Sequence, residues 1–535
     1  MTNVFFPTEQ EIPDKYKVSP VNQTKYLIGG ELREWSGARQ EVLSPICIRD
    51  GDKIEQKVLG SYPMLTPEES MQALDAAVKA YDNGKGVWPT MPVEGRIKHV
   101  EGFLERMTAV RSDVVNLLMW EIGKTYPDSA KEFDRTVEYV KDTIKALKGL
   151  DEQSSRFQRE GGIMAQIRRA PLGKVLCMGP YNYPLNETYT TLIPALIMGN
   201  TVVFKPSKYG VLLHEPLLKA YQESFPPGVL NTIYGDGKTI IGPMMKSGNI
   251  DVLAFIGSCG VSNAIERQHP KPNRLRCVLG LGAKNPGIVL KDADLESAVN
   301  ECVQGSLSYN GQRCTALKVL FVEREIADEF VKKFSEKVDG LGHGMPWQDK
   351  VTITPLPEAG KTQYLDDLVK DAQINGAGVV NLTGRVIDHT FFSPAVLYPV
   401  NSKMKVYHEE QFGPVVPIVP FDNISEPLEY MDNSEVGQQA SIFGKDPEVI
   451  GALIDPLVNQ VCRVNLNSQC QRGPDSFPFT GRKDSAEGTL SITDALRVFS
   501  IRTLVAAKES PQNKEILRGI LKGTTSQFLS TDVIL

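Results

Sequence analysis

Two hydrophobic patterns follow one another along this chain and predict different secondary structures in its early and later parts. In residues 93–123 and 128–149 the apolar side chains recur every three or four positions, which is typical of amphipathic helices. Another helix is predicted to begin at Thr66, because this N-cap residue is followed by Pro67. Residues 25–35 predict a β-hairpin, since two short β-prone runs flank two glycines. We therefore expect the first 150 residues to be largely helical after that hairpin.

From residue 167 onward, short apolar runs alternate with helical segments. This alternation predicts βαβ units and a parallel sheet with helices on both faces. A second alternation starts at residue 286 and continues to about residue 479. The expected strands are residues 171–180, 200–205, 229–234, 250–256, 286–290 and 317–322, and the expected helix of the second region is residues 295–306.

The predicted fold class is α/β, with two doubly wound parallel-sheet domains and a small β extension. We expect the first domain to contain residues 20–152 and 172–282, and the second to contain residues 283–482. Residues 153–171 and 497–508 would form the extension. A β-prone run of this length would be an aggregation hazard if its edge stayed open, so we expect its strand to pair with a sheet edge of another subunit.

Polar residues and glycines follow the expected strands of the first region. Asn182, Lys205, the turn 235–237 and the segment 257–260 each come directly after one strand. In open α/β sheets, ligands bind at the carboxyl ends of the strands. No Gly-x-Gly-x-x-Gly motif follows the first strand, and a single Gly-x-Gly is weak support for a nucleotide site. Four strand ends with such residues indicate a binding edge more strongly than one motif would.

The composition describes a globular protein and excludes several function classes. The chain has 535 residues, of which 41% are hydrophobic and 23% charged, so two or three domains are expected. The net charge of −6 gives no basic surface for nucleic acid. The first residues lack a leader pattern, and no run of about 18 apolar residues occurs. We expect a cytoplasmic protein with neither a nucleic acid nor a membrane partner.

The cysteines and histidines indicate neither a metal site nor disulfides. The eight cysteines form no Cys-x-x-Cys pair, and the six histidines show no ligand spacing, which favours a reducing compartment. One cysteine, Cys314, follows Arg313 and the turn formers Asn310 and Gly311. A neighbouring cation favours the thiolate, so Cys314 is a candidate nucleophile. A lone cysteine is more often a small buried residue, and the assignment depends on the rest of the chain.

Six motifs in order give this chain a resemblance to the aldehyde dehydrogenase superfamily over residues 25–506. Within the superfamily it most resembles the NADP-dependent, non-phosphorylating glyceraldehyde-3-phosphate dehydrogenases. The motifs are Pro-Tyr-Asn-Tyr-Pro at 180–184, Phe-Lys-Pro-Ser at 204–207, Phe-Pro-Pro-Gly at 225–228, Gly-Gln-Arg-Cys at 311–314, Glu-Glu-Gln-Phe-Gly-Pro at 409–414 and Arg-Gly-Pro-Asp-Ser-Phe-Pro-Phe at 472–479.

The resemblance implies a reaction in which a thiolate attacks an aldehyde and the adduct then gives a hydride to a nicotinamide. Cys314 would be the nucleophile, and Asn182 with the backbone N–H of Cys314 would bind the oxyanion. Glu410 would bind the nicotinamide ribose, and Phe412 would lie against the ring. The other residues that the resemblance places at the cofactor are Lys205, Ser207, Lys208, Gly235, Gly257 and Ser258.

Cofactor choice depends on Lys208. NAD-preferring members usually carry an acidic residue at this position, which repels a 2′-phosphate, and a cation there favours NADP. A solvent-facing Lys208 without a cofactor role is the alternative. The resemblance further implies a phosphorylated aldehyde substrate, since Arg313 and Arg472 match phosphate-binding positions and guanidinium groups suit a phosphate dianion. Tyr183 and Arg135 would lie beside them.

The chain departs from the family pattern at Gly280. The family's Glu-Leu-Gly-Gly-Lys motif supplies the glutamate that activates the deacylating water, and here the motif is Gly-Leu-Gly-Ala-Lys at 280–284. Members that acylate coenzyme A also lack this glutamate, so acyl transfer to coenzyme A is the runner-up to hydrolysis. A catalytically silent binding protein is a third reading. The family uses its terminal strand for assembly, which implies a homo-oligomer, either a dimer or a tetramer.

Overall fold

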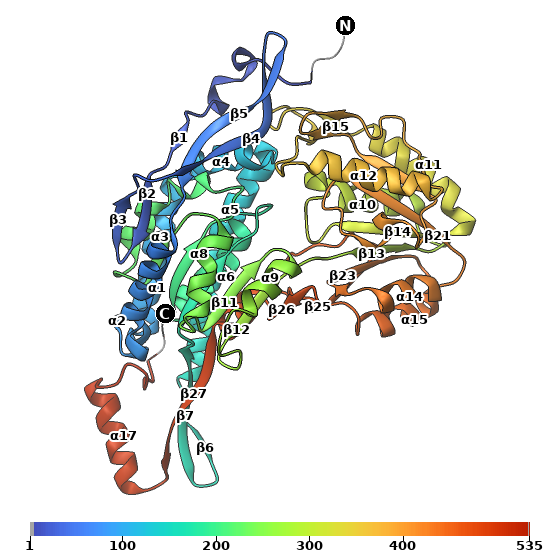
Figure 1. Ribbon diagram of the computed structural model, residues 1–535. Coiled ribbons are helices and arrows are strands. Elements are labelled where there is room, and N and C mark those ends of the chain that lie inside the picture. Colours follow the sequence, from blue (N-terminus) through green and yellow to red (C-terminus); the bar gives the residue numbers. More distant parts are fainter. Residues whose placement is uncertain (1–4, 533, 535) are drawn as a thin grey trace.

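Two large, mainly parallel sheets dominate the computed structural model, which describes all residues except 1–4, 533 and 535 (Figure 1). The α/β fold class expected from the sequence is therefore confirmed. In the described residues, no helix combines the length and the apolar character that crossing a membrane requires.

The first sheet has eight strands, of which the five central ones are parallel. From β8 the chain continues to β9 and β10 on one side of the sheet, and then crosses to β11 and β12 on the other side. The strand order therefore reverses between β8 and β11, and such a topological switch point leaves a crevice at the carboxyl ends of the strands. In sheet order the strands are β26 (Ala486–Glu487), β12 (Arg276–Gly280), β11 (Val252–Ile256), β8 (Lys174–Met178), β9 (Thr201–Lys205), β10 (Leu230–Thr232), β2 (Lys25–Ile28) and β3 (Glu31–Glu34).

The second sheet has seven strands and carries the region around Cys314. Cys314 lies before the amino end of β14, whereas the binding residues of the first sheet follow the carboxyl ends of their strands. The two sheets thus contribute opposite strand ends to the space between them. In sheet order the strands are β17 (Gly378–Val379), β20 (Ala395–Tyr398), β21 (Val415–Phe421), β14 (Leu317–Glu323), β13 (Asn285–Val289), β23 (Gln439–Phe443) and β24 (Arg463–Leu466).

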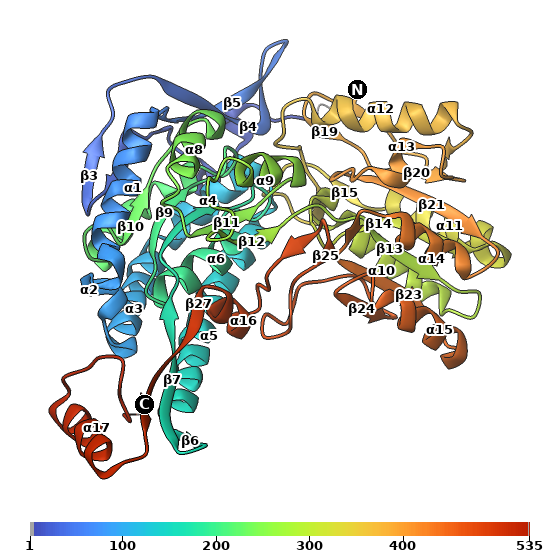
Figure 2. The same ribbon diagram turned by 60° about the horizontal axis from the view of Figure 1, so that its bottom comes forward.

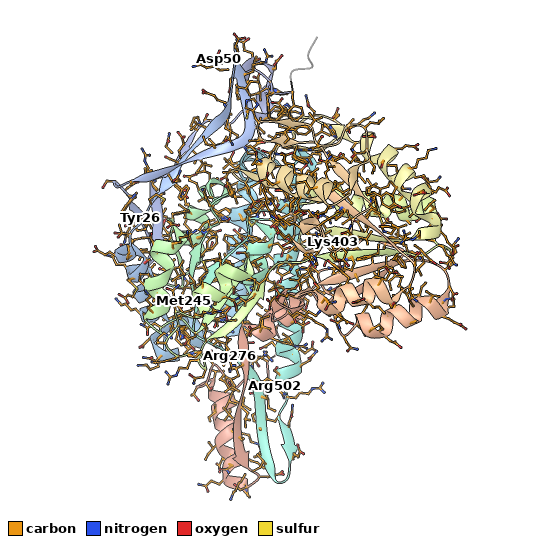
Figure 3. The ribbon with its side chains drawn as sticks, turned by 45° about the vertical axis from the view of Figure 1, so that its right-hand side comes forward. Tyr26, Asp50, Met245, Arg276, Lys403 and Arg502 are labelled. Carbon is orange, nitrogen blue, oxygen red and sulfur yellow. The ribbon has the colours of Figure 1, made fainter. Side chains whose placement is uncertain are left out.

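A three-stranded antiparallel arm projects away from both large sheets (Figures 1 and 2). It contains β6 (Gln158–Glu160), β7 (Ile163–Pro171) and β27 (Ser500–Lys508), and Figure 3 shows Arg502 on it. All nine residues of β27 pair with β7 of the same chain. β7 is thus an antiparallel partner of equal length within the chain, and pairing of β27 with another subunit stays a prediction for its other edge. The other edge of β27 is the outer edge of the arm.

The N-terminal region contains a second hairpin that the sequence patterns did not predict. The first hairpin was predicted, and its two glycines form the turn between β2 and β3. A long pair then follows, β4 (Arg39–Asp50) and β5 (Lys53–Pro63), joined with β1 (Val21–Asn22) in a small sheet. Register shifts break the alternation of buried and exposed positions in β4. The turn glycine Gly51 was the remaining sequence signal.

Helices cover both large sheets, and many of them match the predicted periodicity. Helices α1 and α6 both pack on β9, and α10 and α11 both pack on β14. The helices are α1 (Pro67–Tyr81), α2 (Val87–Thr90), α3 (Val93–Ala109), α4 (Arg111–Ile122), α5 (Tyr126–Ser154), α6 (Asn186–Ile197), α7 (Leu218–Ser224), α8 (Gly237–Lys246), α9 (Cys259–Glu266), α10 (Leu295–Leu307), α11 (Arg324–Asp339), α12 (Lys361–Ile374), α13 (Lys405–His408), α14 (Ser425–Asn433), α15 (Pro447–Leu457), α16 (Ile492–Val498) and α17 (Pro511–Gly523).

Short 3₁₀ helices and strands of two or three residues complete the architecture. The 3₁₀ helices are η1 (Glu9–Glu11), η2 (Asp14–Tyr16), η3 (Asp82–Gly84), η4 (Leu212–His214) and η5 (Ser308–Gly311). The small strands are β15 (Gly342–His343), β16 (Val351–Ile353), β18 (Ile387–Asp388), β19 (Phe391–Phe392), β22 (Val436–Gly437) and β25 (Arg482–Lys483).

Candidate functional site

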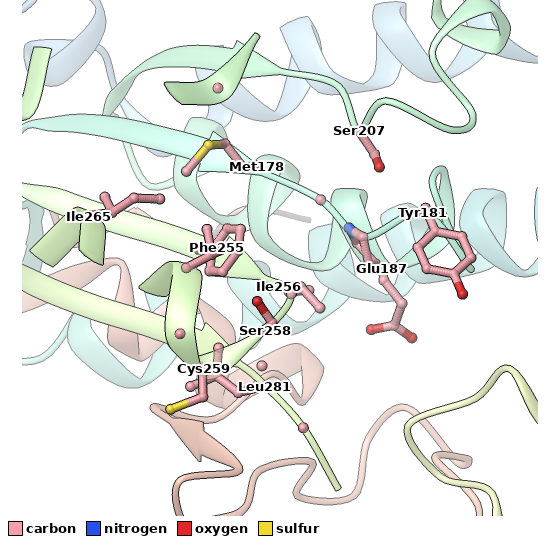
Figure 4. Close-up of a pocket in the computed structure, with 18 of the residues that line it drawn as sticks. Met178, Tyr181, Glu187, Ser207, Phe255, Ile256, Ser258, Cys259, Ile265 and Leu281 are labelled. Atoms are coloured by element: carbon pink, nitrogen blue, oxygen red, sulfur yellow. The ribbon is translucent and has the colours of Figure 1, made fainter. Parts of the chain in front are cut away.

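A cavity of about 860 Å³ opens at the switch point of the first sheet (Figure 4). Residues after β8, β9, β11 and β12 line one side of it, and Cys314 with Glu410 and Phe412 lines it from the second sheet. Figure 4 shows Met178, Phe255 and Ser258 around it. The cavity has the place that the fold rule predicts for a nucleotide, and the candidate nucleophile lies at its inner end.

Most of the residues predicted for the cofactor line this cavity together. They are Lys205, Ser207, Lys208, Gly257, Ser258, Glu410 and Phe412. Gly235 does not line it, although its neighbours Asp236 and Gly237 do. The backbone φ of Gly235 is 138°, a value that side chains rarely adopt, so this glycine shapes the turn between β10 and α8.

The two lysines near the adenosine end of the predicted site have different surroundings. Burial lowers the pKa of Lys205 to about 8, while Asp236 acts in the opposite direction. The Lys205 Nζ donates to the carbonyl of Pro206 at 3.0 Å. Lys208 is exposed at the cavity, with its Nζ 5.5 Å from the centre of the Tyr209 ring. Lys208 is therefore accessible to a ligand phosphate.

Two buried lysines orient the segment that carries Glu410 and Phe412. The Lys284 Nζ donates to the Glu409 carbonyl and to Gln411 Oε1 at 2.7 and 2.6 Å. Lys318 lies 2.8 Å from Glu410 Oε1 and 4.3 Å from the centre of the Phe412 ring. The sequence analysis missed Lys318, although a single lysine inside a predicted buried strand was a visible signal.

The loop before β14 places Cys314 by two local constraints. Gly311 has a φ of 70°, and a side chain there would meet the carbonyl oxygens of Gly413 and Ser306 at 2.8 Å. The Asn285 Nδ2 donates to the Cys314 carbonyl at 2.7 Å. These contacts hold the backbone of the half-buried nucleophile.

The surroundings of the thiol differ from the sequence-based expectation. The pKa of Cys314 is raised to about 11, because burial and the Glu187 carboxylate, which raise it, outweigh Lys318 and Arg472, which lower it. Arg313 does not supply the stabilising cation, because its Nη2 donates to the Gly305 carbonyl at 2.8 Å. Arg313, the residue before Cys314, is thus bonded elsewhere. Lys318, four residues after Cys314, is the cation that lowers the thiol pKa most.

Asn182, the predicted oxyanion donor, lies next to this loop. Its Nδ2 donates one hydrogen bond to the Gln312 carbonyl at 2.8 Å. An amide carries two N–H donors, and within the described residues no second hydrogen bond of this amide is found. One donor therefore fixes the side chain, and the other is available to a substrate oxygen beside Cys314.

A buried ion pair holds the turn that carries Asn182. The Lys124 Nζ contacts the Glu132 carboxylate and donates to the Asn182 carbonyl at 2.9 Å. Glu132 Oε1 accepts from the backbone N–H groups of Leu185 and Asn186, both at 3.1 Å. Both charged side chains are almost fully buried. The sequence analysis missed this pair, since Glu132 lies on a predicted helix, where charges are usually solvated, and Lys124 lies between two predicted helices.

A second cavity, of about 440 Å³, lies on the other side of Cys314. The predicted substrate residues line it together, and they are Tyr183, Arg313, Arg472 and Arg135. Lys131 adds a further cation, and three carboxylates also line it: Asp128, Glu132 and Glu187. The site therefore has a cofactor-sized cavity and a charged cavity that meet at the nucleophile.

Two of the three predicted arginines have ionic partners within the protein. Arg135 forms a two-point contact with Asp475, at 2.7 and 3.0 Å. Arg472 is buried and bonds both Glu187 and Asp475. The third, Arg313, has a buried Nε without a hydrogen-bond partner among the described residues. Arg313 thus differs from the other two in having no carboxylate partner among the described residues.

Gly280 ends β12 and lines the cofactor-sized cavity. Its φ is not in the left-handed region, and an added Cβ would meet Ile256 side-chain atoms at 3.4 Å, an ordinary contact. The backbone therefore accepts a side chain at position 280. The fold does not require a glycine there.

Comparisons with known proteins agree with this arrangement. Residues 46–504 match the model of the aldehyde dehydrogenase family. The NADP-dependent glyceraldehyde-3-phosphate dehydrogenase of Streptococcus equinus is 33% identical over 457 residues, covering 84% of this chain and 92% of that protein. The enzyme of the same name from Apium graveolens is 29% identical over 503 residues, covering 91% of this chain and 96% of that protein.

A solved structure has the same architecture. The NADP-dependent glyceraldehyde-3-phosphate dehydrogenase of Bacillus halodurans, complexed with NADP, superposes with a TM-score of 0.83 at 31% identity. The match covers 92% of this chain and all of that chain. The fold is therefore that of enzymes that oxidise aldehydes with NAD(P).

Replacing Lys124 with Met should lower the free energy of unfolding by about 3–5 kcal/mol, because Glu132 would be left as a buried charge without its cation. Urea titration measures the change. The control is Lys98→Met, which removes one partner of an exposed pair with Glu94 at 2.8 Å and should cost no more than about 1 kcal/mol. Equal effects of the two substitutions would contradict a special role for the buried pair.

Iodoacetamide should alkylate Cys314 faster as the pH rises, by about tenfold per unit between pH 7 and 10, in protein without cofactor. The raised pKa of about 11 makes the thiolate a minor form at neutral pH, and its fraction grows until the pH reaches that value. Lys318→Met should slow the reaction at each pH, since it removes a cation that lowers this pKa. Peptide mass spectrometry measures the labelling, and a plateau near neutral pH would contradict the assignment.

Proposed function

This chain belongs to the aldehyde dehydrogenase family, and from that membership we propose that it oxidises glyceraldehyde 3-phosphate to 3-phosphoglycerate with NADP⁺. The acyl group would be held as a thioester on Cys314 and released by water, without phosphorylation. The observation that carries the substrate proposal is the second cavity, where four cationic side chains surround the space beside the thiol. The relatives with the glyceraldehyde-3-phosphate name give it further support at 28–33% identity.

The cofactor-sized cavity fits a dinucleotide by the chemistry of its donors. Lys205 is half-buried, and the Pro206 carbonyl is the one acceptor found for it among the described residues, so its ammonium suits the adenosine ribose. Glu410 and Phe412 would hold the nicotinamide ribose and ring. When bound, NADP⁺ supplies the hydride acceptor. Lys208, exposed at the cavity, would pair with the 2′-phosphate.

The protein's own steps take place at Cys314. The thiolate adds to the aldehyde carbon, and the free N–H of the Asn182 amide, with the backbone N–H of Cys314, receives the developing oxyanion. After oxidation, the thioester carbon remains next to both cavities, where the acceptor must attack. Arg313 lines the second cavity and has no carboxylate partner among the described residues, so its guanidinium would bind the phosphate of the substrate.

Transfer of the acyl group to coenzyme A is the second candidate. It is favoured by Gly280, which leaves the end of β12 without a carboxylate to activate water.

The reaction test uses purified protein, NADP⁺ and glyceraldehyde 3-phosphate, with and without coenzyme A or inorganic phosphate. We expect NADPH and 3-phosphoglycerate to form at a rate that neither addition changes. Arg313→Gln should raise the KM for glyceraldehyde 3-phosphate by about 10–100-fold, the cost of a charge-assisted hydrogen bond to phosphate, and leave the KM for unphosphorylated glyceraldehyde unchanged. Stimulation by coenzyme A, with an acyl-coenzyme A product, would select the second candidate.

Lys208→Glu should weaken NADP⁺ binding far more than NAD⁺ binding, by about 1–3 kcal/mol if the ammonium meets the 2′-phosphate. The new carboxylate would also repel that phosphate. Titration of each cofactor by protein fluorescence measures both dissociation constants. Equal changes for the two cofactors would place Lys208 outside the cofactor site.

A further inference from the structure

Hydrolysis of the thioester needs a group that takes a proton from water, and position 280 does not supply one. This requirement rests on the proposed function, with water as the acyl acceptor. Four carboxylates line the cofactor-sized cavity and are the candidates within the described residues: Glu187, Asp236, Glu358 and Glu410.

Three of these carboxylates are occupied or distant from the thiol. Glu410 pairs with Lys318 at 2.8 Å and belongs to the predicted ribose contact. Glu358 pairs with Lys361, also at 2.8 Å. Asp236 is exposed at the start of α8, near Lys205 and the adenosine end. None of the three lines the cavity on the substrate side of Cys314.

Glu187 differs from them in its place. It lies in the first turn of α6, is 8% exposed, and lines both cavities, as Cys314 does. Figure 4 shows its side chain projecting from the helix into the cavity. Its Oε2 accepts from Arg472, whereas no hydrogen bond to its Oε1 is found among the described residues. Among the charged groups that act on the Cys314 pKa, it is the strongest, which agrees with a position close to the sulfur.

We propose that Glu187 is the general base of deacylation and replaces the carboxylate missing at position 280. Its Oε1 removes one proton from a water molecule as the water oxygen adds to the thioester carbon. The carbon–sulfur bond then breaks, the electron pair leaves on the Cys314 sulfur as thiolate, and the carboxylic acid product departs. Glu187 passes the proton to solvent, so that the carboxylate is restored for the next cycle.

Arg472 gives this carboxylate a fixed orientation. It bonds one oxygen of Glu187, while its Nη2 donates to the Leu490 carbonyl at 3.0 Å and its Nε to Asp475 at 3.1 Å. These three hydrogen bonds fix the Arg472 guanidinium, and the guanidinium in turn fixes the Glu187 carboxylate. The second oxygen of Glu187 is therefore left for water at a constant place beside the thioester.

The test follows deacylation alone, without aldehyde or cofactor. Excess p-nitrophenyl acetate acetylates Cys314, rapid gel filtration removes the reagent, and intact mass spectrometry follows the loss of the acetyl group. We expect Glu187→Gln to slow this loss by about 100-fold or more, the usual contribution of a general base. Its first acetylation, seen as p-nitrophenolate release, should be as fast or faster, because a carboxylate that raises the thiol pKa has been removed.

If Glu187 had only a structural role, its replacement would slow both acetylation and deacylation. Slower deacylation with unchanged acetylation would exclude a structural role. Adding Gly280→Glu to the Glu187→Gln variant should restore deacylation, since the backbone accepts a side chain there. The control Glu301→Gln removes a half-buried carboxylate of α10 outside both cavities and should change neither step. Deacylation of Glu187→Gln within about threefold of the unaltered protein would overturn the proposal.

The same experiment separates this proposal from the proposed function. If the unaltered acetyl-enzyme is stable in water and decays only when coenzyme A is added, water is not the acceptor, and both fall together. If it decays in water but Glu187→Gln does so equally fast, only the assignment of Glu187 fails.

Discussion

The buried pair of Lys124 and Glu132 is the interaction on which the geometry of the site depends. Glu132 receives two backbone N–H groups from the start of α6, and Lys124 binds the Asn182 carbonyl. Removing two charges from water is costly, and the cost is offset only where each charge is fully bonded. This pair meets that condition, and it fixes at once the oxyanion donor, the Tyr183 ring that Lys124 contacts at 3.6 Å, and the helix turn that carries Glu187.

The charges around Cys314 are balanced within the protein before any ligand is considered. Arg135 and Arg472 share Asp475, and Arg472 also holds Glu187. A cluster of arginines in a sequence motif suggests an anion site, but their number overstates the free positive charge. Arg313 has no carboxylate partner among the described residues, which is why we propose it as the phosphate contact. The same balance leaves the thiol in surroundings that disfavour the thiolate.

The sequence patterns predicted the two parallel sheets and most of the cofactor-site residues, because hydrophobic periodicity and motif positions are local properties. They failed where the decisive contacts are distant in sequence. Arg313 was expected to stabilise the Cys314 thiolate because the two residues are adjacent in sequence. In the structure its guanidinium donates to the Gly305 carbonyl instead. Lys318 acts on the thiol from β14, four residues further along the chain, whereas Glu187 acts from α6 and reaches the thiol only through the packing of the two domains. The hairpin of β4 and β5 was missed because its register shifts remove the alternation that marks a strand.

The edge strands of the eight-stranded sheet come from nearly opposite ends of the chain. β3 closes one edge with residues 31–34, and β26 closes the other with residues 486–487, where it pairs with β12. Contacts between residues so far apart close large loops, and they form late and slowly. During synthesis the first sheet must therefore wait with an open edge until almost the whole polypeptide has left the ribosome. A chain stopped before residue 486 would expose the strand that ends at Gly280, next to the cofactor cavity, to pairing with other molecules.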